Sequence, residues 1–309
     1  MEIVFFGTPE FAVPSLRTLL LSSHRVKLVV AQPDRPAGRG MKLRKPPVAE
    51  VALEAGVPLV QPAKIRDESF LSDIEKTAAE VAVVVAYGRI LPASLLGIPR
   101  HGFVNVHASL LPRYRGAAPI QRAIAHGDRV TGVSIMKLDE EMDHGPVYAT
   151  ERTPIEFDER APSVAARLAV LGGALLVDVL DEIERGTAVA KEQDHDAATY
   201  APKVEKREGE VAWSDRALAI YDRFRAFDPW PGTFTIIRGE SVRLVDITPV
   251  IPRQSLPPGT VLEVGASDLV VACSEGALRV RMAQRPGKKP APAADLARGW
   301  SIAAGAMLG

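Results

Sequence analysis

The first half of this 309-residue chain alternates short apolar runs with stretches of helical pattern. The run from Val81 to Ala86 is continuously apolar, as expected of a parallel strand that is covered on both faces. Strands alternating with helices predict a mostly parallel sheet with right-handed crossovers and helices on both faces, which is a Rossmann-like α/β fold. The expected strands are residues 1–7, 26–31, 81–86, 102–107, 130–138 and 147–155, and the expected helices follow Thr8-Pro9 and span 47–55, 67–77, 117–126 and 162–185.

The last hundred residues have a different pattern. A helix is expected over 214–227, and after it come short alternating segments separated by Gly and Pro, at 233–237, 242–247, 259–264, 269–273 and 278–282. Several short strands at even spacing predict a small β-barrel, here of the OB type. We therefore expect a Rossmann-like domain over 1–189, a linker over 190–208 and a C-terminal β-barrel domain over 209–309.

Composition excludes several classes of protein. The start of the chain has no basic leader, and no apolar run approaches the roughly 20 residues that span a bilayer, so we expect a cytoplasmic protein without a membrane segment. The single cysteine, Cys273, lies in an apolar run and is expected in the core. Six scattered histidines without an HExxH pair argue against a metal site. No heptad seam is visible, so a monomer is the default expectation.

Known cofactor and hydrolase motifs are absent from the sequence. The first strand is followed by Gly7-Thr8-Pro9-Glu10-Phe11, which has neither the GxGxxG spacing of a dinucleotide site nor the lysine of a phosphate loop. No GxSxG elbow of a serine hydrolase occurs. NAD, ATP and serine-hydrolase chemistry are therefore set aside.

Positive charge is concentrated in two segments, although the net charge is zero. Residues 35–45 hold five cations and no acid follows before Ala49, while residues 279–298 hold six cations and the single acid Asp295. Such patches can neutralise the phosphates of a polyanion. Basic runs are also common in plain solvated loops, so the charge pattern alone leaves both interpretations open.

The residues best suited to chemistry are Asn105, His107 and Asp143. Asn105 and His107 share one face of an expected strand, at the carboxyl end where ligand crevices form in open α/β sheets. Asp143 lies in a turn between two later strands. An amide, an imidazole and a carboxylate can bind an oxyanion, move a proton and orient the imidazole, as acyl transfer to an amine requires. A buried hydrogen-bonded pair plus a turn-forming Asp remains the structural alternative.

Five stretches resemble a known family, and together they span nearly the whole chain. They are residues 6–11, 32–40, 86–92, 105–119 and 227–232. The chain resembles the methionyl-tRNA formyltransferases, within the wider group of enzymes that use 10-formyltetrahydrofolate. The Asn-x-His-x-Ser-Leu-Leu-Pro run with the later Asp marks the folate-dependent group, whereas residues 32–40 and Pro229-Trp230-Pro231 point to the enzyme that acts on tRNA.

The resemblance implies a folate-binding N-terminal domain and a C-terminal barrel that helps to hold methionyl-initiator tRNA. It implies Asn105, His107 and Asp143 as the catalytic set, 10-formyltetrahydrofolate as co-substrate and no metal. The folate contacts would be Arg89, Ile90, Leu91, Ser109, Leu110, Leu111 and Pro112, and the tRNA contacts Arg35, Arg39, Lys42, Arg44, Lys45, Lys288 and Lys289. One residue departs from the family pattern, because His144 follows Asp143 where a small residue or Thr is expected.

Three other functions would use some of the same features. A formyltransferase acting on a small amine would share the folate motif but would not need the C-terminal barrel. A hydrolase that releases formate from the folate has no evident use for the basic segments. A non-catalytic RNA-binding module would leave Asn105, His107 and Asp143 without a role.

Overall fold

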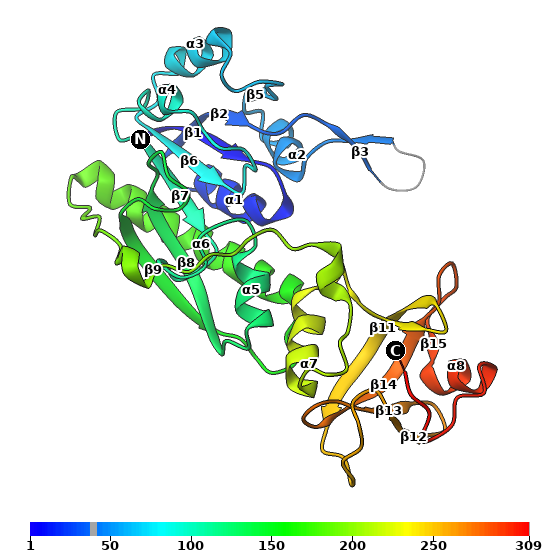
Figure 1. Cartoon of the computed structure of the whole chain (residues 1–309). Coiled ribbons are helices and arrows are strands. Elements are labelled where there is room, and N and C mark those ends of the chain that lie inside the picture. The colour runs from blue at the N-terminus through cyan, green and yellow to red at the C-terminus, as the bar shows by residue number, and fades with distance from the viewer. Residues whose placement is uncertain (38–41, 309) are drawn as a thin grey trace. The chain divides into compact units, whose positions relative to one another are not determined.

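The computed structural model describes residues 1–37 and 42–308. It contains two compact units that are interleaved along the chain (Figure 1). Unit 1 comprises Met1–Pro119, Val130–Pro154 and Ser163–Pro202, and unit 2 comprises Ile120–Arg129, Ile155–Pro162 and the chain from Lys203 onward. Two short segments expected in the first domain thus pack with the second unit, and the domain limits drawn from the sequence remain a prediction.

Unit 1 is built on a seven-stranded sheet in the order β5-β2-β1-β6-β7-β8-β9. The pairs from β5 to β7 are parallel, whereas β7–β8 and β8–β9 are antiparallel. The Rossmann-like, mostly parallel sheet expected from the sequence is confirmed. The strands are β1 Glu2–Gly7, β2 Arg25–Val30, β5 Leu59–Val60, β6 Val81–Val85, β7 Phe103–His107, β8 Val130–Lys137 and β9 Val147–Pro154.

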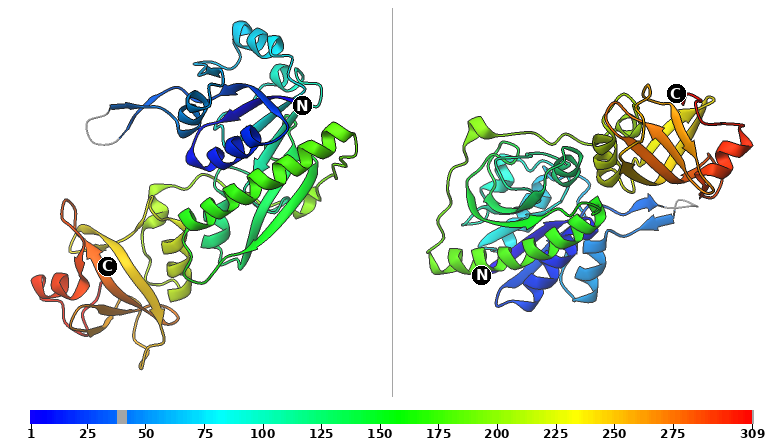
Figure 2. Two further views of the ribbon diagram at one scale, coloured as in Figure 1. Left: turned by 180° about the vertical axis from the view of Figure 1, so that it is seen from behind. Right: turned by 90° about the horizontal axis from the view of Figure 1, so that it is seen from below.

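Helices cover both faces of this sheet because alternate strand residues are apolar on both sides (Figure 2). Ile3 and Phe5 of β1 belong to one core, which also takes side chains from α1, α2 and α6, and Val4 and Phe6 belong to the other, with side chains from α3 and α4. The helices of unit 1 are α1 Val13–Leu21, α2 Pro47–Glu54, α3 Glu68–Lys76, α4 Ala93–Leu96 and most of α6 Ala161–Arg185, with short 3-10 turns η1 Glu10–Ala12 and η2 His195–Ala197. Helix α5 Pro119–Ala125, apart from its first residue, and the 3-10 turn η3 Lys206–Gly209 belong to unit 2.

Helix α6 agrees with the helix expected over 162–185. It is also long and apolar enough to meet the length and hydropathy criteria of a membrane span, the only helix among those described that does. Leu176, Val179 and Leu180 are nevertheless buried in the first core of unit 1. This packing accounts for the apolar composition, because a helix that covers a sheet needs a broad hydrophobic face.

Unit 2 consists mainly of an antiparallel sheet in the order β10-β11-β14-β13-β12, with β15 paired to β14. Side chains of its strands and of α7 and α8 form one core, so a C-terminal antiparallel β domain is confirmed. The elements are α7 Ala217–Ala226, β10 Thr233–Ile237, β11 Glu240–Val250, β12 Val261–Val264, β13 Leu269–Ala272, β14 Ala277–Gln284, β15 Ala291–Pro292 and α8 Ala293–Gly299.

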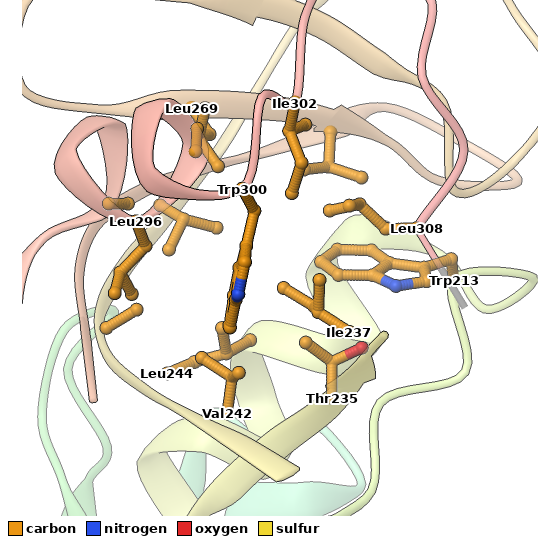
Figure 3. A pocket seen from close by; sticks show the side chains of 15 residues that line it. Trp213, Thr235, Ile237, Val242, Leu244, Leu269, Leu296, Trp300, Ile302 and Leu308 are labelled. Atoms are coloured by element: carbon orange, nitrogen blue, oxygen red, sulfur yellow. The ribbon is translucent and has the colours of Figure 1, made fainter. Parts of the chain in front are cut away.

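The core of unit 2 contains a small apolar cavity between Trp213 and Trp300 (Figure 3). Its volume is about 20 Å³, enough for one water molecule and too small for an organic ligand. Trp213 and Trp300 therefore act as core residues of unit 2. Trp230 does not, because it is 56% exposed.

Cys273 is buried in the core of unit 2, as predicted. Burial raises the pKa of its thiol to about 12, so the reactive thiolate is scarce at neutral pH. We expect a disulfide reagent at pH 8 to modify Cys273 in the native protein at least ~100-fold more slowly than in urea. Equal rates in the two conditions would show that the thiol is accessible and that this part of the core is not packed as described.

Candidate active site

Strand β7 carries the first two residues of the site. It lies where the sheet changes from parallel to antiparallel, between β6 and β8. Val104 and Val106 face the first core of unit 1, so Asn105 and His107 lie on the opposite side of the strand. The sequence prediction that the amide and the imidazole share a face is therefore confirmed.

Asn105 as a residue is 9% exposed. Within residues 1–37 and 42–308 it has no hydrogen-bond partner. Its amide atoms keep some solvent-accessible surface, so a ligand can reach them. The amide is therefore available to bind a substrate atom.

His107 is held by one ring nitrogen and meets Asp143 with the other. Its Nε2 lies 2.9 Å from the Tyr114 carbonyl oxygen, which can only accept, so Nε2 carries a proton. Its Nδ1 lies 3.5 Å from Oδ1 of Asp143. The structure thus brings the imidazole and the carboxylate together and leaves Nδ1 as the ring nitrogen that can exchange a proton with substrate.

Two features fix Asp143 on its loop: its backbone conformation and a hydrogen bond from the Gly116 N–H to its carboxylate. Its φ of 51° is unusual for a residue with a side chain. The Gly116 N–H donates to Oδ2 at 2.8 Å, which leaves Oδ1 facing His107. Gly116 has a φ of 120°, and a Cβ there would lie 2.8 Å from the Ala201 carbonyl oxygen, so only glycine allows this approach.

Gln193 and Arg115 hold the Asp143 loop, and sequence reasoning did not identify either. The Gln193 amide nitrogen donates to the carbonyl oxygens of Asp143 at 2.9 Å and of Gly145 at 2.7 Å. Its Oε1 accepts from the Arg115 guanidinium at 2.8 and 3.2 Å. Both side chains are buried. They are far apart in the sequence, and no local pattern links them to Asp143.

His144, the residue that departs from the family pattern, packs beside this network. Its ring stacks on His195 with centroids 4.0 Å apart, and its Nδ1 lies 2.7 Å from Oδ2 of Asp139. His195 Nδ1 lies 2.8 Å from Nη2 of Arg115 and accepts a hydrogen bond from it, since a guanidinium only donates. The contacts of His144 therefore reach Asp143 through His195, Arg115 and Gln193.

The comparisons with known proteins decide the family. Residues 1–180 match the model described as formyl transferase, and residues 203–301 match the model of the formyl transferase C-terminal domain. The methionyl-tRNA formyltransferase of Sorangium cellulosum is 46% identical over the full length of both chains. That of Thermus thermophilus is 46% identical over 100% of this chain and 99% of the relative. The chain belongs to the methionyl-tRNA formyltransferase family.

Solved structures agree with this family in fold. An N-formyltransferase from Helicobacter canadensis, in complex with folinic acid and dTDP-3-aminofucose, has a TM-score of 0.67 at 15% identity and covers 92% of this chain and 98% of its own. HypX from Aquifex aeolicus in complex with tetrahydrofolic acid has a TM-score of 0.60 at 19% identity over 96% of this chain and 46% of HypX. At such identities the likeness concerns the fold alone.

The segment expected to contact folate follows β7 and is anchored to β8. Ser109 is buried and its hydroxyl donates to the Arg113 carbonyl oxygen at 2.6 Å. Ser134 of β8 donates to the Ser109 carbonyl oxygen at 2.7 Å and accepts from the Leu111 N–H at 3.1 Å. Ser134, another residue that sequence reasoning missed, therefore fixes the path of residues 109–112 beside His107.

In the second expected folate segment, residues 89–91, the three side chains differ in their contacts and exposure. The Arg89 guanidinium donates to Oε1 of Gln32 at 3.1 Å and to the Ala63 carbonyl oxygen at 2.8 Å. Ile90 is 81% exposed, while Leu91 packs against the second core of unit 1. Arg89 thus ties its loop to neighbouring loops, and Ile90 is the side chain of the three that is open to a ligand.

The basic residues of the first cluster lie on a hairpin that projects from unit 1 (Figure 1). Strands β3 Arg35–Ala37 and β4 Lys42–Arg44 pair antiparallel, with Arg35 opposite Arg44. Arg35, Lys42, Arg44 and Lys45 are exposed. Arg39 lies outside the described residues. Lys288 and Lys289 are exposed in the turn between β14 and β15 of unit 2.

One set of side chains with metal-ligand chemistry lies elsewhere in unit 1, at the amino end of β1. It consists of His24, Asp181 and Glu184, whose ligand atoms are within 4.8 Å of one another. The Met1 amine already lies 2.8 Å from Glu184 and 3.2 Å from Nδ1 of His24. Burial and this neighbouring ammonium lower the pKa of His24. The Met1 ammonium thus already balances part of the negative charge of this cluster.

Proposed function

We propose that the chain transfers the formyl group of 10-formyltetrahydrofolate to the α-amino group of methionyl-initiator tRNA. The observation that carries this proposal is the Asn105 amide, which has no partner among the described residues and stays accessible, next to the His107–Asp143 pair. Asn105 and His107 lie at the carboxyl end of β7, and open α/β folds bind ligands at the carboxyl ends of their strands. The names of the relatives that match over full length support methionyl-tRNA as the acceptor.

The reaction then follows from the chemistry of the three groups. Roughly a tenth or more of the esterified methionine has an unprotonated amine at neutral pH, because α-amino groups titrate at about 8. Its lone pair attacks the formyl carbon, and the carbonyl oxygen becomes an oxyanion. Asn105 donates to this oxygen, and protonated His107 donates from Nδ1, since Nε2 is bound to Tyr114.

Proton transfer completes the step. Asp143, through the Oδ1 that faces His107, accepts the proton of the attacking amine directly or through water. The oxyanion then collapses, the bond between the formyl carbon and N10 of the folate breaks, and N10 takes the proton that Asp143 accepted, which restores the carboxylate. The products are the N-formylated methionyl ester and tetrahydrofolate. Residues 109–112 and 89–91 are proposed to bind the folate, with no metal taking part in the reaction.

RNA binding is proposed for the exposed cations of the β3–β4 hairpin and for Lys288 and Lys289. Each cation that neutralises an RNA phosphate releases counterions, which makes the affinity fall with salt. The protein is proposed to act in the cytoplasm, as a monomer and without a membrane.

The proposal predicts the effect of Arg39→Ala. We expect KM for methionyl-tRNA to rise about fivefold at physiological salt, since the loss of one cation weakens electrostatic binding to the RNA phosphates. KM for the folate should not change. Arg100→Ala, which removes an exposed cation of unit 1 outside the β3–β4 hairpin, is the control. An unchanged KM for the tRNA would contradict the role of this loop.

The acceptor itself is tested by following a labelled formyl group. The protein is incubated with labelled 10-formyltetrahydrofolate alone, with methionyl-initiator tRNA, with glycinamide ribonucleotide and with an amino sugar nucleotide. Label is expected on methionine esterified to tRNA. Release of formate without tRNA would instead identify a hydrolase, and label on a small amine would identify a small-molecule formyltransferase.

A further inference from the structure

Unit 2 contains a polar cavity that the proposed reaction does not use. Its volume is about 220 Å³, room for several water molecules at about 30 Å³ each. Its wall is formed by the turn after α7, by β10, β11 and β14 and by the loop before α6, and the polar lining residues are Arg160, Asp228, Thr233, Arg243 and Gln284. None of these belongs to the site around β7.

Arg243 is held at the edge of this cavity by the backbone. Its Nη2 donates to the Pro229 carbonyl oxygen at 3.0 Å. The guanidinium also lies against Gly232, where an added Cβ would be 2.9 Å from Nε and 3.1 Å from Cζ. A guanidinium has five N–H donors. In the part of the chain that the structure describes, the Pro229 carbonyl is the one acceptor that Arg243 meets.

The guanidinium of Arg160, in the loop before α6, also lines the cavity. Arg160 lies 4.5 Å over the Phe224 ring, and its Nη1 is 3.3 Å from Oδ2 of Asp228. Two arginines and one aspartate line the cavity, so its polar wall carries a net positive charge. Stacking on an aromatic ring and pairing at one edge fix the direction of a guanidinium and leave its other edge for an anion.

The remaining polar groups fit the same kind of ligand. The buried Thr233 hydroxyl has no hydrogen-bond partner among the described residues, which is uncommon in a folded protein. Gln284 donates to the Lys288 carbonyl oxygen at 2.7 Å. This bond ties the turn with exposed Lys288 and Lys289 to the wall of the cavity, where Pro290 is also a lining residue.

We propose that this cavity binds a phosphate group, with Arg243 and Arg160 as its ligands. Arginine forks match the oxygens of a phosphate in geometry and charge. The inference rests on the proposed function for the source of that phosphate, which is the backbone of the substrate RNA. Lys288 and Lys289 at the rim extend the positive surface along which such a backbone runs.

The test compares Arg243→Gln with Arg253→Gln, which removes an exposed arginine in the loop after β11, outside the cavity. Melting temperatures without ligand confirm that both variants fold. In the RNA arm, the dissociation constant of methionyl-tRNA is measured over a range of salt concentrations. Arg243→Gln is expected to raise it roughly fivefold and to lower the salt slope by about one unit. kcat and the folate KM should stay those of the parent.

The second arm uses inorganic phosphate alone. We expect millimolar phosphate to raise the melting temperature of the parent and of Arg253→Gln more than that of Arg243→Gln. An effect confined to this arm would support the phosphate site and identify a free phosphate as its ligand. If Arg243→Gln behaves like Arg253→Gln in both arms, the phosphate site is disproved. If the parent formylates no tRNA, the proposed function fails, and the phosphate arm still decides the site.

Discussion

Asn105→Ala is expected to slow single-turnover formyl transfer to methionyl-tRNA by roughly 100- to 1000-fold, the usual effect of removing one oxyanion donor. The physical reason is that the amide interacts with the oxygen of the formyl group more strongly once that oxygen becomes negative. Affinity for the folate should change little, because the neutral formyl oxygen gains less from the same donor.

The same variant separates catalysis from structure. Asn105 has no hydrogen-bond partner among the described residues, so its removal leaves no protein group unpaired. The free energy of unfolding, measured with urea, should fall by no more than about 1 kcal/mol. A rate within about threefold of the parent would exclude Asn105 as an oxyanion donor.

Gln193→Leu should have the second largest effect. The substitution keeps the size of the side chain but leaves the carbonyls of Asp143 and Gly145 and the buried Arg115 without their shared partner. Asp143 then loses its fixed position relative to His107. We expect kcat to fall roughly 10- to 100-fold, because small displacements of a catalytic group are costly, while KM for both substrates stays within about threefold.

A control distinguishes positioning from a general loss of stability. Gln61→Leu also removes an amide that bridges two oxygens of unit 1, those of the Gln32 backbone and the Asp34 carboxylate. It should leave kcat unchanged. Rates are expressed per folate-binding site, so that unfolded protein does not count. If both variants lower kcat equally, Gln193 has no specific role in positioning Asp143.

Much of unit 1 could be predicted from the sequence because its signals are local. The apolar run over 81–86 and the period-two pattern around Val104 and Val106 depend on neighbouring residues only, and both agree with the observed strands. The shared face of Asn105 and His107 follows from the same period. The turn at Asp143 was likewise visible in its sequence.

The rest of the site depends on contacts between distant segments. Gln193 meets Asp143 across 50 residues of sequence and Arg115 across 78. Neither contact leaves a periodic signal. The partner of His107 Nε2 is a backbone carbonyl, which any residue at position 114 would supply. For the same reason the sequence could not show that the segments around 120–129 and 155–162 pack with unit 2.

The central claim is that the Asn105 amide binds the formyl oxygen while the formyl carbon faces the His107–Asp143 pair. A crystal structure with an unreactive 10-formyl folate analogue tests it directly. We predict the formyl oxygen at about 2.7–3.1 Å from the Asn105 amide nitrogen. A formyl group bound away from Asn105, with this amide turned to a protein partner, would contradict the proposed mechanism.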